Sequence, residues 1–231
     1  MDTDDALAAR LARDLDAAFP DLVAAHADRL YTIALRLLGD PSDAEEVAQD
    51  ALVRAHRAMA GYEPARIREL RLRPWLASIA VNLARNRRRR ISDRHPAESL
   101  EPLADAGFDP HDDTADPPAA ALQRESAAEL AMLLLRLPPL LRAPIVLRHV
   151  DGLSVAETAA ALGRPEGTIK AQVSRGLDRL RELLEAAAPT PRPATGGPPR
   201  SGAGRPGVVS HAPLPHDVVG GRILAAAEVL P

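Results

Sequence analysis

Two short helices separated by a helix-breaking turn are predicted for the segment from Gly152 to Leu180, GLSVAETAAALGRPEGTIKAQVSRGLDRL. Ser154 predicts the start of the first helix, because its hydroxyl can accept a backbone hydrogen bond while Glu157, three residues on, completes a capping box. Gly163 supplies a left-handed helix stop, and Pro165 cannot continue the hydrogen-bond ladder. Two helices that cross at a tight corner are the expected local structure.

The second of these helices divides into an apolar stripe and a polar face. Gly167 lets the chain re-enter a helix, and Thr168 is the expected N-cap. Helical spacing then predicts a buried stripe, made of Ile169, Val173, Leu177 and Leu180. The outward side chains, which can donate to phosphates or base edges, are Lys170, Gln172, Ser174 and Arg175. The pattern predicts a DNA-reading helix-turn-helix; the alternative is an ordinary packed helix pair with a solvated face.

A second basic feature lies in the amino-terminal half of the chain. Between residues 64 and 94 there are ten arginines and two acidic residues, in a chain whose formal net charge is -3. The positive charge is therefore concentrated, and clustered arginine suits phosphate binding because it is permanently charged and forms bidentate contacts. A solubilising helix end is the alternative. Two separated DNA-competent elements argue for an extended contact.

Composition and periodicity decide the fold class. The chain is 46% hydrophobic but only 2% aromatic, so its cores must be built from alanine, leucine, valine and isoleucine. Helix formers dominate and strand-like alternation is absent, which predicts an all-α protein. With 231 residues, the chain can form two small domains and tails.

Punctuating residues predict the first helices. We expect a short acidic helix over residues 4–18 and a longer helix that begins at Pro20 and ends at Gly39. Ser42 and Glu45 form a second capping box that opens the next helix, antiparallel to the one before it.

The next segment, residues 61–73, alternates charges with Gly and Pro and is expected to be a loop with at most one helical turn. Pro74 then begins a helix that runs into the arginines. Trp75 could be a stacking platform for a base, but its helical phase favours a place in the core.

Several classes of function are disfavoured by what the sequence lacks. There is no cysteine, which excludes disulfides and thiolate metal sites, and the seven histidines are scattered without metal-ligand spacing. We expect no enzymatic activity, no cofactor and no bound metal. No apolar run approaches the length of a membrane span and no basic-then-apolar leader is present, so we expect a cytoplasmic protein without membrane insertion.

These patterns divide the chain into five parts. The expected organisation is two small helical domains joined by a flexible acidic linker, the second domain containing the helix-turn-helix. The parts are an acidic helix (1–19), a first helical domain (20–92), the linker (93–118), a second helical domain (119–186) and a Pro- and Gly-rich tail (187–231).

Three segments in this order resemble the extracytoplasmic-function (ECF) group of bacterial RNA polymerase sigma factors. They are LYTIALRLLGDPSDAEEVAQDALVRAHRAM, RPWLASIAVNLARNRRRR and LPPLLRAPIVLRHVDGLSVAETAAALGRPEGTIKAQVSRGLDRLREL. The resemblance covers residues 20 to about 184, and it is the order and separation of the segments that make it specific. It implies that residues 20–92 are sigma domain two and residues 119–186 are sigma domain four.

The resemblance implies a non-enzymatic subunit that binds core RNA polymerase, directs it to promoter DNA and helps to melt the duplex; family members commonly have an anti-sigma factor as a further partner. Polymerase binding would fall to Glu46, Gln49, Asp50 and Arg54. Binding of the minus-ten element would fall to Arg71, Arg73, Asn82, Arg85, Asn86, Arg87, Arg88 and Arg89. Binding of the minus-thirty-five element would fall to Arg164, Thr168, Lys170, Gln172, Ser174, Arg175 and Arg179.

Two other classes of function stay open at this point. A stand-alone helix-turn-helix regulator would bind duplex DNA without polymerase, although nothing in the sequence resembles a dimerisation helix or a ligand domain. A protein-interaction module would use both helical units to hold a regulator. The recognition helix is also less basic than family members often are, since Ala171, Ser174 and Leu177 stand where basic or aromatic residues are common.

Overall fold

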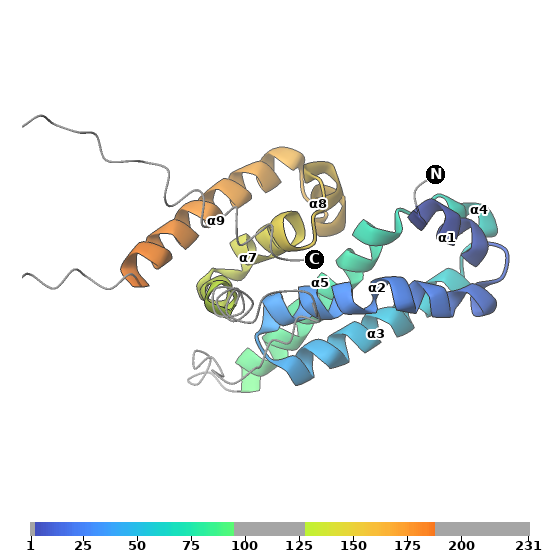
Figure 1. Ribbon diagram of the computed structural model, residues 1–231, viewed down its shortest axis with the longest axis horizontal. Helices are drawn as coiled ribbons and strands as arrows, with labels where there is room; N and C mark the ends of the chain where they lie inside the picture. Colours follow the sequence, from blue (N-terminus) through green and yellow to red (C-terminus); the bar gives the residue numbers. More distant parts are fainter. Residues whose placement is uncertain (1–2, 95–127, 188–231) are drawn as a thin grey trace, which may run out of the picture.

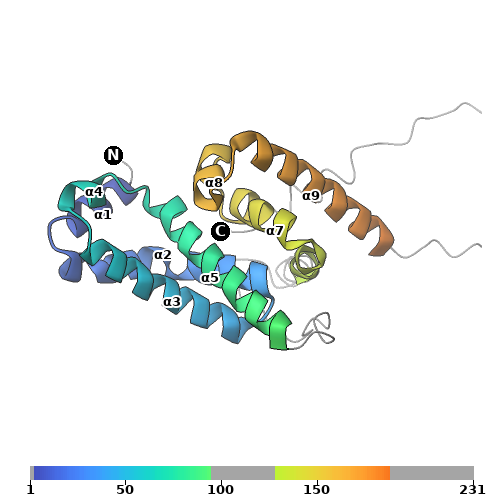
Figure 2. The ribbon, with the colours of Figure 1, turned by 180° about the vertical axis from the view of Figure 1, so that it is seen from behind.

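The computed structural model describes residues 3–94 and 128–187, which form helices joined by short turns (Figures 1 and 2). The amino-terminal domain contains α1 (Thr3–Leu11), α2 (Leu15–Leu38), α3 (Pro41–Ala60), α4 (Pro64–Arg68) and α5 (Leu72–Arg94). The carboxyl-terminal domain contains a helix over 128–136, α7 (Pro139–Ile145), the π-helical turn η1 (Val146–Val150), α8 (Val155–Leu162) and α9 (Glu166–Ala187). The predicted all-α class is confirmed. The acidic linker and the tail fall almost wholly outside the described residues.

The amino-terminal domain is built on the pair of α2 and α3, against which α5 packs, while α1 and α4 lie together at one end (Figure 1). Its core is aliphatic, as the composition requires. The largest fully buried side chains in it are Leu11, Leu22, Leu30, Ile33, Met59, Leu72 and Leu76. The helical turn expected within residues 61–73 is α4.

Two predicted helix starts in this domain are wrong. The long helix begins at Leu15, because the side chain of Asp14 accepts the backbone N–H of Ala17 at 3.1 Å and caps it. Pro20 therefore lies inside α2 and does not begin it. The ring removes one N–H donor, and the carbonyl that loses this donor belongs to exposed Asp16, where water can replace it. The acidic helix expected over residues 4–18 is also too long, because α1 ends at Leu11.

The start of α3 also lies earlier in the sequence than expected. Asp40, and not Ser42, is the N-cap, because its carboxylate accepts the backbone N–H of Asp43 at 2.7 Å. Pro41 occupies the first helical position, for which its fixed φ is suited. Ser42 consequently lies within the first turn, and its predicted capping box with Glu45 does not form.

The carboxyl-terminal domain contains the predicted helix-turn-helix, α8 followed by α9 (Figure 1). The capping box of Ser154 and Glu157 is present, and Gly163 ends α8 with φ 61°. The expected cap at Thr168 is wrong: the carbonyl of Pro165 already accepts the N–H of Ile169 at 3.1 Å, so α9 begins at Glu166. Apart from the core that this domain shares with the first, a smaller cluster is made by Leu133, Leu134, Leu137, Ile145, Leu180 and Leu183.

The two domains pack against each other. Helix α5 lies beside α8, and η1 lies beside α2. Apolar residues of the second domain join the core of the first; they are Ala143, Val146, Leu147, Leu153 and Ala161. We call this contact the seam. The two domains are therefore closed against each other. This arrangement was not predicted from the sequence.

Gly39 offers a test of how closely the domains approach. It ends α2 with φ 84°, and a Cβ placed on it would lie 2.6 Å from the Cδ1 atom of Leu135 in the second domain. We expect Gly39→Ala to lower the free energy of unfolding by about 1–3 kcal/mol, because it adds left-handed backbone strain to a steric conflict. Urea unfolding followed by circular dichroism measures this.

Gly61→Ala is the matched control for that substitution. Gly61 caps α3 at φ -96°, and its added Cβ would meet only the carbonyl oxygen of Ala58, at 3.6 Å. We expect a change within about 0.5 kcal/mol. Equal losses in the two variants would contradict the strain and the close approach at Gly39.

Candidate nucleic-acid interface

The amino-terminal half of α9 presents most of the side chains predicted to reach DNA. Lys170, Ser174, Arg175 and Arg179 are exposed, while Arg164 and Thr168 are half-buried. Arg175 also donates through Nε to the carbonyl of Ala171 at 3.2 Å. The exposed set forms a polar face from which hydroxyl, ammonium and guanidinium donors extend.

Gln172 is the exception, and its predicted outward orientation is wrong. Its side chain is buried, with 4% of the residue exposed. The inward face of α9 runs through Ile169, Gln172 and Gly176, and Val173 is only half-buried. Gly176 sits so close to α7 that a Cβ on it would lie 2.3 Å from the Cδ1 atom of Ile145.

The buried amide of Gln172 has a structural contact instead. Its Oε1 atom accepts a hydrogen bond from the NH1 group of Arg164 at 2.8 Å. This bond orients the guanidinium at the turn between α8 and α9. Burial, and then repulsion by Arg85, lower the pKa of Arg164, which shows that cations from both predicted DNA sites are close in the closed arrangement.

The residues of the arginine-rich helix α5 are of two kinds: some side chains are exposed, and others are paired with residues of neighbouring helices. Asn82, Arg85, Asn86 and Arg89 are exposed, and Arg88 is half-buried. Arg87 is held by two acids of α3: its Nε atom donates to Asp43 at 2.8 Å and its NH1 group to Glu46 at 2.7 Å. These bonds raise the pKa of Arg87, the hydrogen bond to Asp43 contributing most. Arg87 therefore braces α5 against α3.

Two arginines at the start of α5 contact the other domain: Arg71, which precedes the helix, and Arg73, which lies in its first turn. The NH2 group of Arg71 donates to the Oε1 atom of Glu157 at 2.9 Å. The NH2 group of Arg73 donates to the backbone carbonyl of Asp151 at 2.8 Å. Both arginines are thus brought to the seam.

All four residues predicted to bind polymerase lie exposed on α3: Glu46, Gln49, Asp50 and Arg54. Three of them line a pocket between α3 and α5. The pocket lining is Glu46, Val47, Asp50, Arg54, Leu83, Asn86, Arg87 and Arg90. Alternating acids and arginines around two apolar side chains make this a surface of mixed charge. It suits a charged protein partner better than a small apolar ligand.

Trp75 lies where its helical phase predicts. It is half-buried and packs against the amino-terminal core, and its ring centroid is 6.3 Å from that of Tyr62. The guanidinium of Arg66 stacks over the other aromatic ring, 3.8 Å from the centroid of Tyr62. These contacts anchor α4 to the start of α5 and confirm the core position of Trp75.

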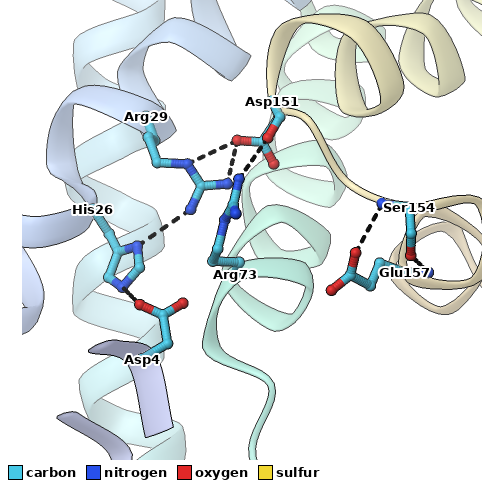
Figure 3. A network of polar contacts seen from close by, with 7 residues as sticks. All are labelled: Asp4, His26, Arg29, Arg73, Asp151, Ser154 and Glu157. Atoms are coloured by element: carbon cyan, nitrogen blue, oxygen red, sulfur yellow. Dashed lines mark hydrogen bonds and ion pairs between the residues drawn. The ribbon is translucent and has the colours of Figure 1, made fainter. Parts of the chain in front are cut away.

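A polar network at the seam was not predicted from the sequence (Figure 3). Asp151 is only 7% exposed, and its Oδ1 atom accepts from the Nε atom of Arg29 at 2.9 Å and from the NH2 group of the same side chain. Burial raises the pKa of Asp151, and the charge and hydrogen bonds of Arg29 oppose the rise. Sequence patterns carry no signal for such a pair, because the partners are 122 residues apart.

His26 extends the network into the amino-terminal domain (Figure 3). It is 3% exposed; its Nδ1 atom lies 3.4 Å from the NH1 group of Arg29, and its Nε2 atom lies 3.5 Å from the Oδ1 atom of Asp4. Burial lowers the pKa of His26, the carboxylate of Asp4 opposes this, and the cations of Arg29 and Arg73 add to the lowering. The buried imidazole is therefore neutral near pH 7.

This predicts a specific dependence of stability on pH. The unfolded chain protonates His26 near pH 6.5 and the folded chain only at lower pH, so the stabilisation from the neutral ring is complete above about 6.5 and is lost as the pH falls. Between about pH 7.5 and about pH 5.5 we expect the native protein to lose more unfolding free energy than His26→Gln, with a slope difference of at most about 1.4 kcal/mol per pH unit. Urea unfolding at both pH values measures it; equal losses would contradict the prediction.

Metal clusters and membrane-spanning helices are both absent from the part of the chain that the structure describes. Residues 3–94 and 128–187 contain no group of three or more histidine, aspartate or glutamate side chains arranged to hold a metal ion. Over the same ranges, no helix is long and apolar enough to cross a membrane.

Comparison with known proteins identifies the two domains. The Sigma-70 region 2 family model matches residues 22–94, and the Sigma-70, region 4 model matches residues 127–180. The ECF RNA polymerase sigma factor SigE of Mycolicibacterium smegmatis is 34% identical over 71% of this chain and 60% of its own length. The ECF RNA polymerase sigma factor SigW of Bacillus subtilis is 30% identical over 72% of this chain and 89% of its own length.

The fold has the same relatives. The structure of CnrH in complex with the cytosolic domain of CnrY matches with a TM-score of 0.58 and 28% identity, over 81% of this chain and 100% of that chain. Sigma-70 regions 2 and 4 together define a DNA-binding protein of transcription initiation. The chain belongs to the ECF RNA polymerase sigma factor family.

Proposed function

We propose that the protein directs core RNA polymerase to a set of promoters by contacting two DNA elements with its two domains. The observation that carries this is the pairing, in one molecule, of an exposed basic face on α9 with an exposed polar and basic face on α5. The minus-thirty-five element is contacted at its base edges or phosphates by Lys170, Ser174, Arg175 and Arg179. Arg164 lies beside this set of residues. Thr168, in the first turn of α9, adds a hydroxyl. Gln172 orients Arg164 and does not touch DNA in this arrangement.

The amino-terminal domain binds the minus-ten element. Asn82, Arg85, Asn86, Arg88 and Arg89 supply amide and guanidinium donors to an unstacked strand, and Arg71 and Arg73 join them when they are released from the seam. Arg87 holds α5 in place through its two acidic partners. Melting of the duplex follows from the capture of unpaired bases, since flipping a base costs a few kcal/mol that these donors offset.

Exposed Glu46, Gln49, Asp50 and Arg54 on α3 bind core polymerase. The protein acts by binding, without catalysing a reaction, and works in the cytoplasm, where the polymerase and promoter DNA are. An anti-sigma factor is a further proposed partner; the structure of CnrH, to which this chain is similar, is of a complex with the cytosolic domain of CnrY. Residues 20–92 and 119–186 are the functional domains, joined by 93–118.

In vitro transcription tests this function. Purified core polymerase is incubated with fragmented genomic DNA, with and without the protein, and transcript start sites are mapped. We expect start sites that appear only with the protein and share two spaced upstream elements. No new start sites, together with tight duplex binding by the protein alone, would favour the stand-alone helix-turn-helix regulator; neither activity would favour the protein-interaction module.

A further inference from the structure

His26 is a buried titratable group that the proposed function does not use (Figure 3). Only 3% of the residue is exposed. Its Nε2 atom faces the carboxylate of Asp4 on α1 at 3.5 Å, and its Nδ1 atom faces the NH1 group of Arg29 on α2 at 3.4 Å. A neutral imidazole donates through one nitrogen and accepts through the other. These partners assign the proton to Nε2, toward the carboxylate, and the lone pair to Nδ1, toward the guanidinium.

A second proton on the ring disturbs only one of these two contacts. It binds at Nδ1, where it removes the lone pair that faces Arg29 and places two cations against each other. The contact between Nε2 and Asp4 is strengthened, because the ring then carries a positive charge. The repulsion that protonation of His26 produces therefore falls on Arg29.

Arg29 is the residue of α2 that pairs with the second domain. Its Nε atom donates to the Oδ1 atom of Asp151 at 2.9 Å, and its NH2 group donates to the same oxygen. The other carboxylate oxygen, Oδ2, is buried and has no hydrogen-bond partner among the described residues. Displacement of Arg29 leaves this carboxylate, which is 2% exposed, without its cation, and that is costly in a buried site. Proton binding at His26 and closure of the seam therefore oppose each other.

The charges around the ring give the same sign. Burial, Arg29 from α2 and Arg73 from α5 lower the pKa of His26, and Asp4 from α1 opposes the lowering. The second domain holds both arginines in place, because Arg73 also donates to the backbone carbonyl of Asp151, at 2.8 Å. When the domains separate, both cations are free to leave the ring, and the pKa of His26 rises toward its ordinary value. The contribution of the neutral ring to the closed arrangement is therefore complete above about pH 6.5 and is lost as the pH falls.

We propose that His26 is a proton switch for the seam: a proton on its Nδ1 atom repels Arg29, weakens the pair of Arg29 with Asp151 and favours separation of the two domains. The inference goes beyond the proposed function, since it needs neither DNA nor polymerase. Each unit of acidification changes the ratio of closed to open molecules by at most about tenfold. The arrangement of the domains thus depends on pH in the range where histidine titrates.

Energy transfer between the two domains of the full chain tests the switch. The chain has no cysteine, so Ala60→Cys on α3 and Ala160→Cys on α8, both at exposed alanines, can carry a pair of dyes whose absorption does not change with pH. We expect the transfer efficiency to fall between about pH 7.5 and about pH 5.5, because separation lengthens the mean distance between the dyes, and to recover at the higher pH. Circular dichroism at both pH values establishes that the helices remain formed.

Two substitutions assign the effect to the ring. His26→Gln cannot take up a proton in this range, so its transfer efficiency is expected to stay constant. Asp4→Asn removes the carboxylate that favours the protonated ring, so its transition is expected to move to lower pH. His149→Gln is the matched control. Burial also lowers the pKa of His149, but the cation that acts on it is Arg148 of the same helical turn, so its transition should coincide with the native one.

Three results would overturn the proposal. The first is a transfer efficiency that does not change with pH in the native sequence while its helices are intact. The second is a transition in folded His26→Gln that matches the native one. If His26→Gln does not fold, Asp4→Asn decides, and an unshifted transition in that variant is the third. None of them bears on the proposed function, which is read separately from polymerase-dependent start sites.

Discussion

Arg142→Met is expected to lower the free energy of unfolding by about 2–5 kcal/mol, a large part of the stability of a protein of this size. Arg142 is 2% exposed, and its guanidinium donates to three backbone carbonyls: Leu37 at 2.7 Å, Leu137 at 2.9 Å, and Leu135. Leu37 lies in the last turn of α2, whose carbonyls have no partner within the helix. Methionine fills similar space but leaves these acceptors unpaired at the seam.

The buried site of Arg142 disfavours its positive charge. Burial and the nearby cation of Arg88 lower the pKa of Arg142 to about 10, so the side chain is charged at pH 7 although its site disfavours the charge. The three carbonyls offset that cost through charge-assisted hydrogen bonds. Arg142→Lys keeps the charge but not the planar fork that reaches three acceptors, so we expect an intermediate loss.

Urea unfolding monitored by circular dichroism measures these losses. Arg136→Met is the matched control, because Arg136 is an exposed arginine on the helix over 128–136, which also supplies Leu135. A surface substitution of that kind is expected to change stability by no more than about 0.5 kcal/mol. A loss at Arg142 no greater than at Arg136 would show that the buried fork contributes nothing to stability.

Lys170→Ala combined with Arg175→Ala is expected to lower promoter-dependent transcription by about tenfold or more. Both side chains are exposed on the amino-terminal half of α9, the half that enters the major groove in helix-turn-helix proteins. A lost base contact weakens binding by about 1–3 kcal/mol, and a lost phosphate contact reduces the salt dependence of binding.

Binding of the holoenzyme to a promoter found by start-site mapping, measured over a range of salt concentrations, separates the two contributions. We expect Lys170→Ala to reduce the salt slope and Arg175→Ala to reduce discrimination between promoter sequences. Arg181→Ala is the control, since Arg181 lies further along the same helix and pairs with Asp178 at 2.8 Å. An equal effect of all three substitutions would mean that α9 contributes only its overall charge.

Much of the fold was predictable because it depends on short-range chemistry. The capping box of Ser154 and Glu157 and the left-handed stop at Gly163 each involve residues only a few positions apart, and all three are present. The errors at Pro20, Ser42 and Thr168 have one form: each helix begins earlier than expected, at Leu15, Pro41 and Glu166. In α2 and α3 the aspartate nearest the true start, Asp14 or Asp40, prevailed.

The candidate site was predicted less completely, for a different reason. Exposure of Lys170, Arg175 and the polar residues of α5 follows from helical phase, which the sequence carries. Gln172 was expected outside because it is polar, but it lies three residues after buried Ile169, near the same face of α9, and is buried. An amide that bonds to a neighbouring arginine looks the same in a sequence as an amide that reads a base.

The sequence by itself determined the all-helical class, the helix-turn-helix, the aliphatic core and the concentration of arginine on one segment, because each is set by composition or by spacing along one helix. Only the tertiary structure decided which arginines form hydrogen bonds with distant parts of the chain. Arg73 and Asp151 are 78 residues apart, Arg142 and Leu37 are 105 apart, and Arg29 and Asp151 are 122 apart. Such pairs form when packing brings together side chains that are far apart in the sequence, and no local pattern encodes that choice.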